Sequence, residues 1–215
     1  MKTTLIALLA LRLCLPLGCG KKAPEQQVNQ PTEATLTPGM KAAKKAHDEG
    51  HYQEAVRLYT AELAAEEAKP APSWVQLSYL NNNLGLALNN AGQYDKALEY
   101  HEKALAIRLK QLGPGHTDVA NSYNNIGGVH DAKGEYDKAL EYYRKSLAIR
   151  LKQLGPGHPS VATSYNNMAL VYYAKKDLTK AKEYFGKAYA ILLKKLGPNH
   201  PNTKDAKAGL DRLNK

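Results

Sequence analysis

Cysteine is scarce in this sequence, and recognisable catalytic patterns are missing. Only Cys14 and Cys19 occur among 215 residues, and Cys14 falls in an N-terminal segment typical of a cleaved signal. Cys19 would then have no partner for an internal disulfide. No nucleophile stands at a recognisable spacing from a base, no phosphate-binding loop is present, and cysteine and histidine form no ligand cluster. We therefore expect no catalytic site, metal or cofactor, and predict that the protein is not an enzyme.

Long hydrophobic runs are also missing. The apolar run LIALLAL at residues 5–11 ends at Arg12. It is shorter than the roughly 20 apolar residues that cross a bilayer. A charged start, a short apolar stretch and a small residue before the cleavage point are typical of a secretory signal. We expect residues 1–18 to be that signal.

The end of this segment, LPLGCGKK, resembles a bacterial lipoprotein signal. Gly18 and Cys19 match that pattern, whereas Pro16 and Arg12 depart from it. The resemblance implies that Cys19 is the lipid attachment site and that the protein is exported to the cell envelope as a membrane-anchored lipoprotein, facing the periplasm or the surface. An ordinary cleaved signal, or simply an apolar N-terminus, is the alternative. Residues 19–38 are polar and contain proline, which predicts a flexible tether.

Phenylalanine and tryptophan occur once each, whereas tyrosine occurs 14 times and partly recurs at a fixed step. The same step separates two copies of LAIRLKQLGPGH, at residues 105–116 and 147–158, and a looser copy ends 42 residues later at His200. Self-similarity at a fixed period indicates a repeat array, whose terminal units are expected to diverge. The step continues through one further set of positions, occupied by Gly50, Gly92, Gly134 and Lys176.

Each unit predicts two helices joined by a tight turn. In the unit 119–158 one helical stripe comprises Ala120, Tyr123, Ile126, Gly127 and His130, and a second comprises Leu140, Tyr143, Leu147, Leu151 and Leu154. Gly134 separates the two helices and Gly155-Pro156 ends the second. Two further sets of positions stay small, which lets paired helices approach closely: Ala43, Gly85, Gly127 and Ala169, and Ala55, Ala97, Ala139 and Ala181.

Three histidines, His116, His158 and His200, also stand 42 residues apart. Repeats translate such residues along an array instead of bringing them together, so we interpret them as joint residues near helix starts. A metal site is the alternative reading. Pro159 follows the second of them and suits a first helical turn.

Acidic residues number 20 against 30 basic ones, a formal charge of +10, or +8 without Lys2 and Arg12 of the signal. Much of the excess recurs near the ends of the expected second helices, where cations are favourable, and we interpret it as a solvated outer surface. Attraction to anionic head groups or a polyanionic wall fits this charge better than nucleic acid, which we do not expect as a partner. The basic residues that recur near the ends of the second helices are Arg108, Lys110, Arg150, Lys152, Lys194 and Lys195.

The helix pairs, with Gly-x-Tyr-x-x-Ala at their turns, resemble tetratricopeptide repeats. The 42-residue period, SYNNIG and SYNNMA, and the joint LAIRLKQLGPGHP resemble the kinesin-light-chain subtype. The first unit departs at its joint (KPAPSW), and the fourth departs at its turn (KKDLTKA). The resemblance implies an all-α fold: a tetratricopeptide repeat superhelix, or α-solenoid, of about four helix pairs over residues 39–200, with a C-terminal cap helix over residues 201–215.

The resemblance also assigns the concave face of the superhelix to the first helix of each pair. In related domains that hold extended peptides, an asparagine there bonds the main chain or carboxylate of the peptide. The candidate groove residues are Asn83, Asn125, Asn167, Asn121, Lys41 and Lys44. The alternative is that the asparagines only satisfy hydrogen bonds of helix packing.

Two functions follow from this. The protein is either an interaction scaffold of the bacterial envelope that binds a segment of a partner protein, or an architectural accessory subunit of an envelope enzyme or secretion complex whose groove is unused. The sequence leaves the partner and the oligomeric state open.

Overall fold

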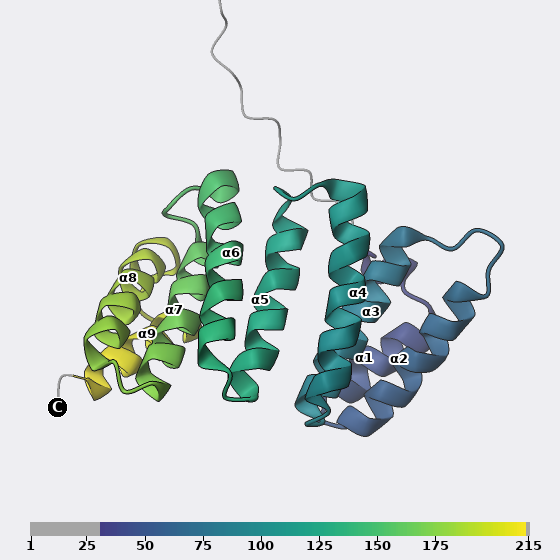
Figure 1. Ribbon diagram of the computed structural model, residues 1–215, viewed down its shortest axis with the longest axis horizontal. Helices are drawn as coiled ribbons and strands as arrows, with labels where there is room; N and C mark the ends of the chain where they lie inside the picture. Colours follow the sequence, from purple (N-terminus) through teal and green to yellow (C-terminus); the bar gives the residue numbers. More distant parts are fainter. Residues whose placement is uncertain (1–30, 214–215) are drawn as a thin grey trace, which may run out of the picture.

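A computed structural model of the chain describes residues 31–213, and every regular element in this range is a helix. The all-α prediction is confirmed. The helix pairs follow one another in chain order from one end of the molecule to the other (Figure 1). The elements are η1 (Glu33–Thr35), α1 (Pro38–Asp48), α2 (Tyr52–Glu67), α3 (Trp74–Asn90), α4 (Tyr94–Leu112), α5 (Thr117–Ala132), α6 (Tyr136–Leu154), α7 (Pro159–Ala174), α8 (Leu178–Leu196) and α9 (Pro201–Arg212).

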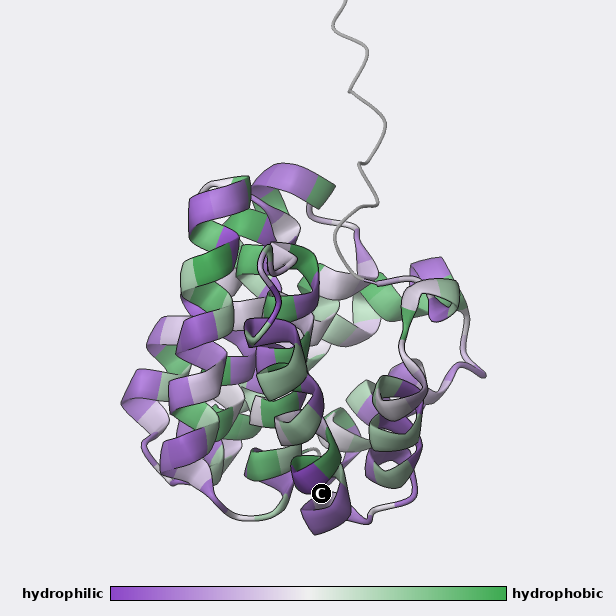
Figure 2. Cartoon of the chain, turned by 90° about the vertical axis from the view of Figure 1, so that its right-hand side faces the viewer, coloured by the Kyte–Doolittle hydropathy of each residue, from purple (hydrophilic) through white to green (hydrophobic). Residues whose placement is uncertain are grey.

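Four helix pairs and a cap build the array, as predicted. The most extensive contacts lie within the pairs α1–α2, α3–α4, α5–α6 and α7–α8, and each second helix also packs on the next first helix. The cap helix α9 packs on α8. In Figure 2 most helices show both a hydrophilic and a hydrophobic side, as expected when one face of each helix is buried. No helix within residues 31–213 is both long and apolar enough to cross a membrane.

The turns inside the pairs require a left-handed backbone. Gly50, Gly92 and Gly134 have φ values of 81°, 76° and 76°, and Lys176 at the fourth station has a φ of 64°. A Cβ added at any of the three glycines would meet nothing within 4 Å. Glycine is therefore favoured at these turns by backbone conformation and not by lack of space.

The small residues bring paired helices close together, as predicted. A Cβ added at Gly127 would lie 2.9 Å from the ring of Tyr143 and 3.3 Å from the carbonyl oxygen of Ala139. At Gly85 it would lie 2.8 Å from the ring of His101. The cost of glycine inside a helix is thus offset by close packing of the aromatic ring in the partner helix.

The buried stripe of the second helices differs from the predicted one. In α6 the buried residues are Ala139, Leu140, Tyr143, Ser146 and Arg150. The predicted core residues Leu147, Leu151 and Leu154 are only half-buried. Ala139, Ser146 and the hydrogen-bonded Arg150 lie at the buried positions of α6, and Leu147, Leu151 and Leu154 flank them.

The folded part also starts before the predicted boundary at residue 39. Leu36 is buried in the first core cluster. Thr37 caps α1 by accepting a hydrogen bond from the backbone nitrogen of Met40 at 3.0 Å, and it donates to Glu62 Oε2 at 2.5 Å. The predicted signal, Cys19 and residues 19–30 of the predicted tether lie outside the described residues.

Candidate functional site: the first-helix face

The candidate site is the surface formed by the first helix of each pair, α1, α3, α5 and α7, which we call the first-helix face. Along it α3 contacts α5, and α5 contacts α7. The predicted groove residues come from all four helices. Lys41 and Lys44 lie on α1, Asn83 on α3, Asn121 and Asn125 on α5, and Asn167 on α7.

Two hydrogen bonds between asparagines connect successive repeats on this face. Asn125 Nδ2 donates to Asn82 Oδ1 at 2.9 Å, and Asn167 Nδ2 donates to Asn124 Oδ1 at 3.0 Å. Both bonds span 43 residues, so each links the first helices of neighbouring repeats. We call these two bonds the asparagine ladder. The amide nitrogens of Asn125 and Asn167 therefore bond inside the array.

The ladder ends where the sequence no longer supplies its partners. Met40, which lies 43 residues before Asn83, offers no side-chain oxygen, and Asn83 Nδ2 donates to the carbonyl oxygen of Tyr79 at 2.8 Å. At the other end Gly209 lies 43 residues after Asn166, whose Oδ1 is buried and has no hydrogen-bond partner among residues 31–213. A Cβ at Gly209 would lie 2.5 Å from the ring of Phe185, so asparagine does not fit there.

Asn121 bonds a buried arginine. Arg150 Nη2 donates to Asn121 Oδ1 at 2.9 Å, while its Nη1 donates to Ser164 Oγ at 2.9 Å and to the carbonyl oxygen of Ser160 at 3.0 Å. Only 6% of Arg150 is exposed. The guanidinium of Arg150 thus joins α5, α6 and α7. Asn121, which was predicted to contact a partner, has a structural role in this joint.

Arg108 repeats the arrangement one unit earlier. Its Nη1 lies 2.8 Å from Ser122 Oγ and 3.4 Å from both Asn82 Oδ1 and the carbonyl oxygen of Asp118, and 3% of the residue is exposed. Burial lowers the pKa of both guanidinium groups, and the Asp118 carboxylate opposes this at Arg108.

The prediction that Arg108 and Arg150 belong to a solvated outer surface is wrong. Arg150 lies four residues after Ser146 and seven after Tyr143, on the buried side of α6. This spacing along the helix was the feature of the sequence that could have predicted the burial of Arg150. A guanidinium can lie there because its fixed N–H groups match the surrounding oxygens. At the fourth station Leu192 replaces arginine and packs in a cluster with Ala206, which replaces the serine.

The lysines of the first repeat are on the surface. Lys41 is exposed. Lys44 Nζ lies 2.7 Å from a carboxylate oxygen of Asp48, and this hydrogen bond raises the pKa of Lys44. Lys44 is therefore already neutralised in part, and Lys41 is the more available cation for an acidic partner group.

Two large hydrophobic side chains stay exposed on α7. Leu170 is 44% exposed and Tyr173 is 42% exposed. They lie four and seven residues after Asn166 and therefore on the same side of the helix as the end of the ladder. The asparagines Asn83, Asn125 and Asn167 are half-buried. The first-helix face thus combines asparagine side chains with an apolar patch near its C-terminal end.

The comparison with known proteins agrees with this geometry. A family model described as Tetratricopeptide repeat matches residues 76–152, 132–194 and 160–210. The chain belongs to the tetratricopeptide repeat family. Repeats of this family generally mediate protein–protein interaction. No curated protein matches the chain.

Solved structures show the same repeat architecture. The crystal structure of BtubC (BKLC) from P. vanneervenii is 24% identical, with a TM-score of 0.69 over 80% of this chain and 68% of that one. Two structures of a putative kinesin light chain from Podosopora anserina with nearly identical TPR-like repeats are 27% and 28% identical. Their TM-scores are 0.66 and 0.65, over 80% of this chain and 82% of theirs. The resemblance to kinesin-light-chain-like repeats is confirmed.

In this tetratricopeptide array the three periodic histidines are helix caps. The Nδ1 atoms of His116, His158 and His200 accept hydrogen bonds from the backbone nitrogens two residues on, at 3.1, 3.1 and 3.2 Å. Their interpretation as joint residues is confirmed. Within residues 31–213 no three histidine, cysteine or acidic side chains are grouped to hold a metal ion.

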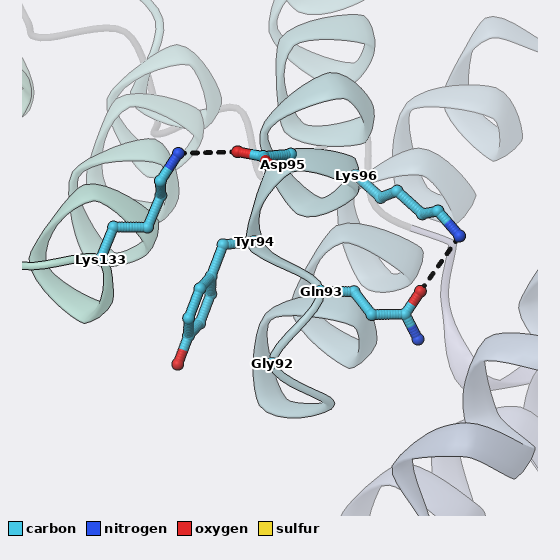
Figure 3. A pocket seen from close by; sticks show the side chains of 6 residues that line it. All are labelled: Gly92, Gln93, Tyr94, Asp95, Lys96 and Lys133. Carbon is cyan, nitrogen blue, oxygen red and sulfur yellow. Dashed lines mark hydrogen bonds and ion pairs between the residues drawn. The ribbon is translucent and has the colours of Figure 1, made fainter.

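An open pocket of about 310 Å³ lies at the turn between α3 and α4 (Figure 3). Lys133 Nζ bonds Asp95 Oδ1 at 2.7 Å across it, and Lys96 Nζ bonds Gln93 Oε1 at 3.2 Å. A second inter-repeat pair, Lys175 with Asp137, follows 42 residues later. The Lys133–Asp95 pair of this pocket thus joins two repeats, whereas the Lys96–Gln93 bond lies within one repeat.

Proposed function

We propose that the protein is an interaction scaffold that binds an extended segment of a partner protein on its first-helix face. The observation that carries this proposal is the exposure of Leu170 and Tyr173 beside the end of the asparagine ladder. Exposed apolar side chains grouped next to polar ones are a feature of protein–protein contact sites. The other first-helix positions offer hydrogen-bonding groups along the length of such a segment.

The ladder determines which hydrogen-bonding groups remain for a partner. Because Asn125 and Asn167 each donate through Nδ2 to the preceding repeat, their Oδ1 atoms are the acceptors left to bond a partner. A carbonyl oxygen accepts hydrogen bonds. The backbone N–H groups of an extended segment are therefore the chemistry that these positions favour, with Lys41 on α1 available for an acidic group.

We further propose that the scaffold is tethered in the bacterial envelope by a lipid on Cys19. The support is the match of Gly18 and Cys19 to a lipoprotein signal. A Cys19→Ser variant should be released from membranes or left unprocessed, because several acyl chains anchor far more firmly than one. Fractionation of cells that express either form checks this, and a variant that stays cleaved, abundant and membrane-bound would remove Cys19 from the proposal.

A second function is favoured by the ladder itself. Asn125 and Asn167 bond neighbouring repeats, and Asn121 bonds Arg150, so these asparagines are part of the architecture. In this alternative the protein is an architectural accessory subunit of an envelope enzyme or secretion complex, and its first-helix face is unused.

Site-specific photo-crosslinking separates the two functions. A photoreactive residue placed at Leu170 should crosslink one discrete protein in intact cells if this face binds a partner. The matched control is the same residue at Leu193, which is 38% exposed but lies on the second helix α8. Discrete products from position 193 and none from position 170 would favour the architectural alternative.

A further inference from the structure

The charge of the second helices changes steadily along the array. Basic residues number one in α2, four in α4, five in α6 and five in α8. Acidic residues number four in α2, three in α4, two in α6 and one in α8. The first helices α3 and α7 contain no charged residue of these types. Among the second helices, the positive charge is therefore concentrated at the C-terminal end of the array, whereas α2 at the opposite end is acidic. Figure 1 places α8 and α2 at opposite ends of the molecule.

The basic residues of α8 lie on its exposed side. Lys180, Glu183, Lys187, Ala190 and Lys194 are all exposed and follow one another at steps of three and four. Such spacing places them on one stripe of the helix. Helix α6 presents the same stripe 42 residues earlier, with Lys138, Glu141, Lys145, Ala148 and Lys152, all exposed.

Helix α8 adds charge that the earlier repeats lack. Lys182 occupies the station of Leu140, which is buried one repeat earlier, and Lys195 occupies the station of Gln153. Lys182, Lys194 and Lys195 are exposed, and within residues 31–213 none of them forms an ion pair with a carboxylate. By contrast Lys187 pairs with Glu183 at 2.5 Å. The three lysines are therefore available to an external anion.

We propose that these stripes form a docking surface for the anionic head groups of a lipid bilayer. The surface, which we call the basic face, comprises Lys138, Lys145 and Lys152 of α6 and Lys180, Lys187, Lys194 and Lys195 of α8. Clusters of four to eight basic residues on a helix surface are attracted to anionic lipids. The acidic α2 end is repelled, so the array approaches the bilayer with its C-terminal repeats.

One detail favours a bilayer over a nucleic acid. Residues 173–215 contain ten lysines but one arginine. Lysine acts as a compact point charge, whereas bidentate recognition of phosphates and bases favours arginine.

Vesicle sedimentation tests this proposal without the lipid anchor. The chain from residue 20 onward retains every residue that the structure describes. It should sediment with phosphatidylcholine vesicles that contain phosphatidylglycerol, but not with phosphatidylcholine alone, and 0.5 M salt (about a 4 Å screening length) should release it. Equal sedimentation with both vesicles would overturn the proposal. So would binding to double-stranded DNA without binding to anionic vesicles, which would make a nucleic acid the partner.

A matched pair of variants locates the binding surface. Lys152→Gln/Lys194→Gln/Lys195→Gln removes three charges from the basic face, and Lys41→Gln/Lys44→Gln/Lys45→Gln removes three exposed charges from α1. Each lysine near an anionic surface strengthens binding roughly fivefold. The first variant should therefore bind anionic vesicles about a hundredfold more weakly than the wild type, and the second variant should bind them like the wild type. Circular dichroism verifies that both are folded. Equal losses in the two variants would show that net charge alone, and not the basic face, drives the association.

Discussion

At the scale of single residues, His101 stands out in the core. Tyr59, Tyr143 and Phe185 occupy the same station in the other repeats, and His101 alone carries two ring nitrogens there. It is 1% exposed, and neither nitrogen has a hydrogen-bond partner among the described residues. Burial lowers its pKa from 6.5 to about 4, and the nearby charge of Arg108 acts in the same direction. The folded state therefore favours the neutral imidazole.

This histidine predicts a specific loss of stability in acid. The unfolded chain binds a proton at His101 near pH 6.5, whereas the folded chain does so only near pH 4. The stabilising contribution is complete above pH 6.5 and decreases as the pH falls toward 4, by roughly 3 kcal/mol in total. Urea unfolding of wild type and His101→Tyr, which copies the Gly127–Tyr143 pair, measures this difference. Parallel pH profiles of the two proteins would contradict it.

At the scale of helices, the asparagine ladder holds successive repeats in register. Asn125→Ala removes the bond to Asn82 Oδ1, whereas Asn83→Ala removes only a bond to its own helix. We expect Asn125→Ala to lower the free energy of unfolding by about 1–3 kcal/mol, because a half-buried oxygen loses a partner. Asn83→Ala is the matched control and should cost less. Thermal and urea unfolding measure both losses. Equal losses of stability in the two variants would show that the ladder does not stabilise the array.

The arginine joints give a second prediction about helix packing. Arg150→Ala should cost about 3 kcal/mol, because it leaves Ser164 and Asn121 without their buried partner. The double change Arg150→Leu/Ser164→Ala copies the Leu192–Ala206 joint of the fourth repeat and should recover most of that stability. Unfolding of the single and double variants measures the recovery. A double variant no more stable than Arg150→Ala would show that the two joints are not equivalent.

The sequence predicted the helix pairs well because their signals are local. The 42-residue period, the turn glycines and the small residues each report on one helix or one turn. Arg108 and Arg150 were misplaced because an arginine near a helix C-terminus is usually exposed, and only the helical phase relative to Ser146 argued otherwise. The ladder was not predicted because its bonds span 43 residues instead of 42. That offset follows from how successive repeats pack and cannot be read from the period.

At the scale of the whole molecule, the array separates two surfaces. The first-helix face is nearly uncharged at α3 and α7 and exposes Leu170 and Tyr173, while the second helices become more basic toward α8. If the outer helices lie on a bilayer as we propose, the first-helix face stays free for a partner. The charge excess was visible in the sequence, but its concentration on the outer side of α6 and α8 required the helix bounds and their exposure.

Binding of a partner on the first-helix face can be tested directly. The most direct measurement is the dissociation constant of the crosslinked partner for Leu170→Asp/Tyr173→Ser and for the matched control Leu193→Asp/Leu196→Ser, with melting temperatures of both. The four side chains are exposed to similar extents, so neither variant should lose much stability. We expect the affinity to be at least tenfold weaker for the first variant and equal to that of the wild type for the control. Unchanged affinity for the first variant, or an equal loss in both, would contradict it.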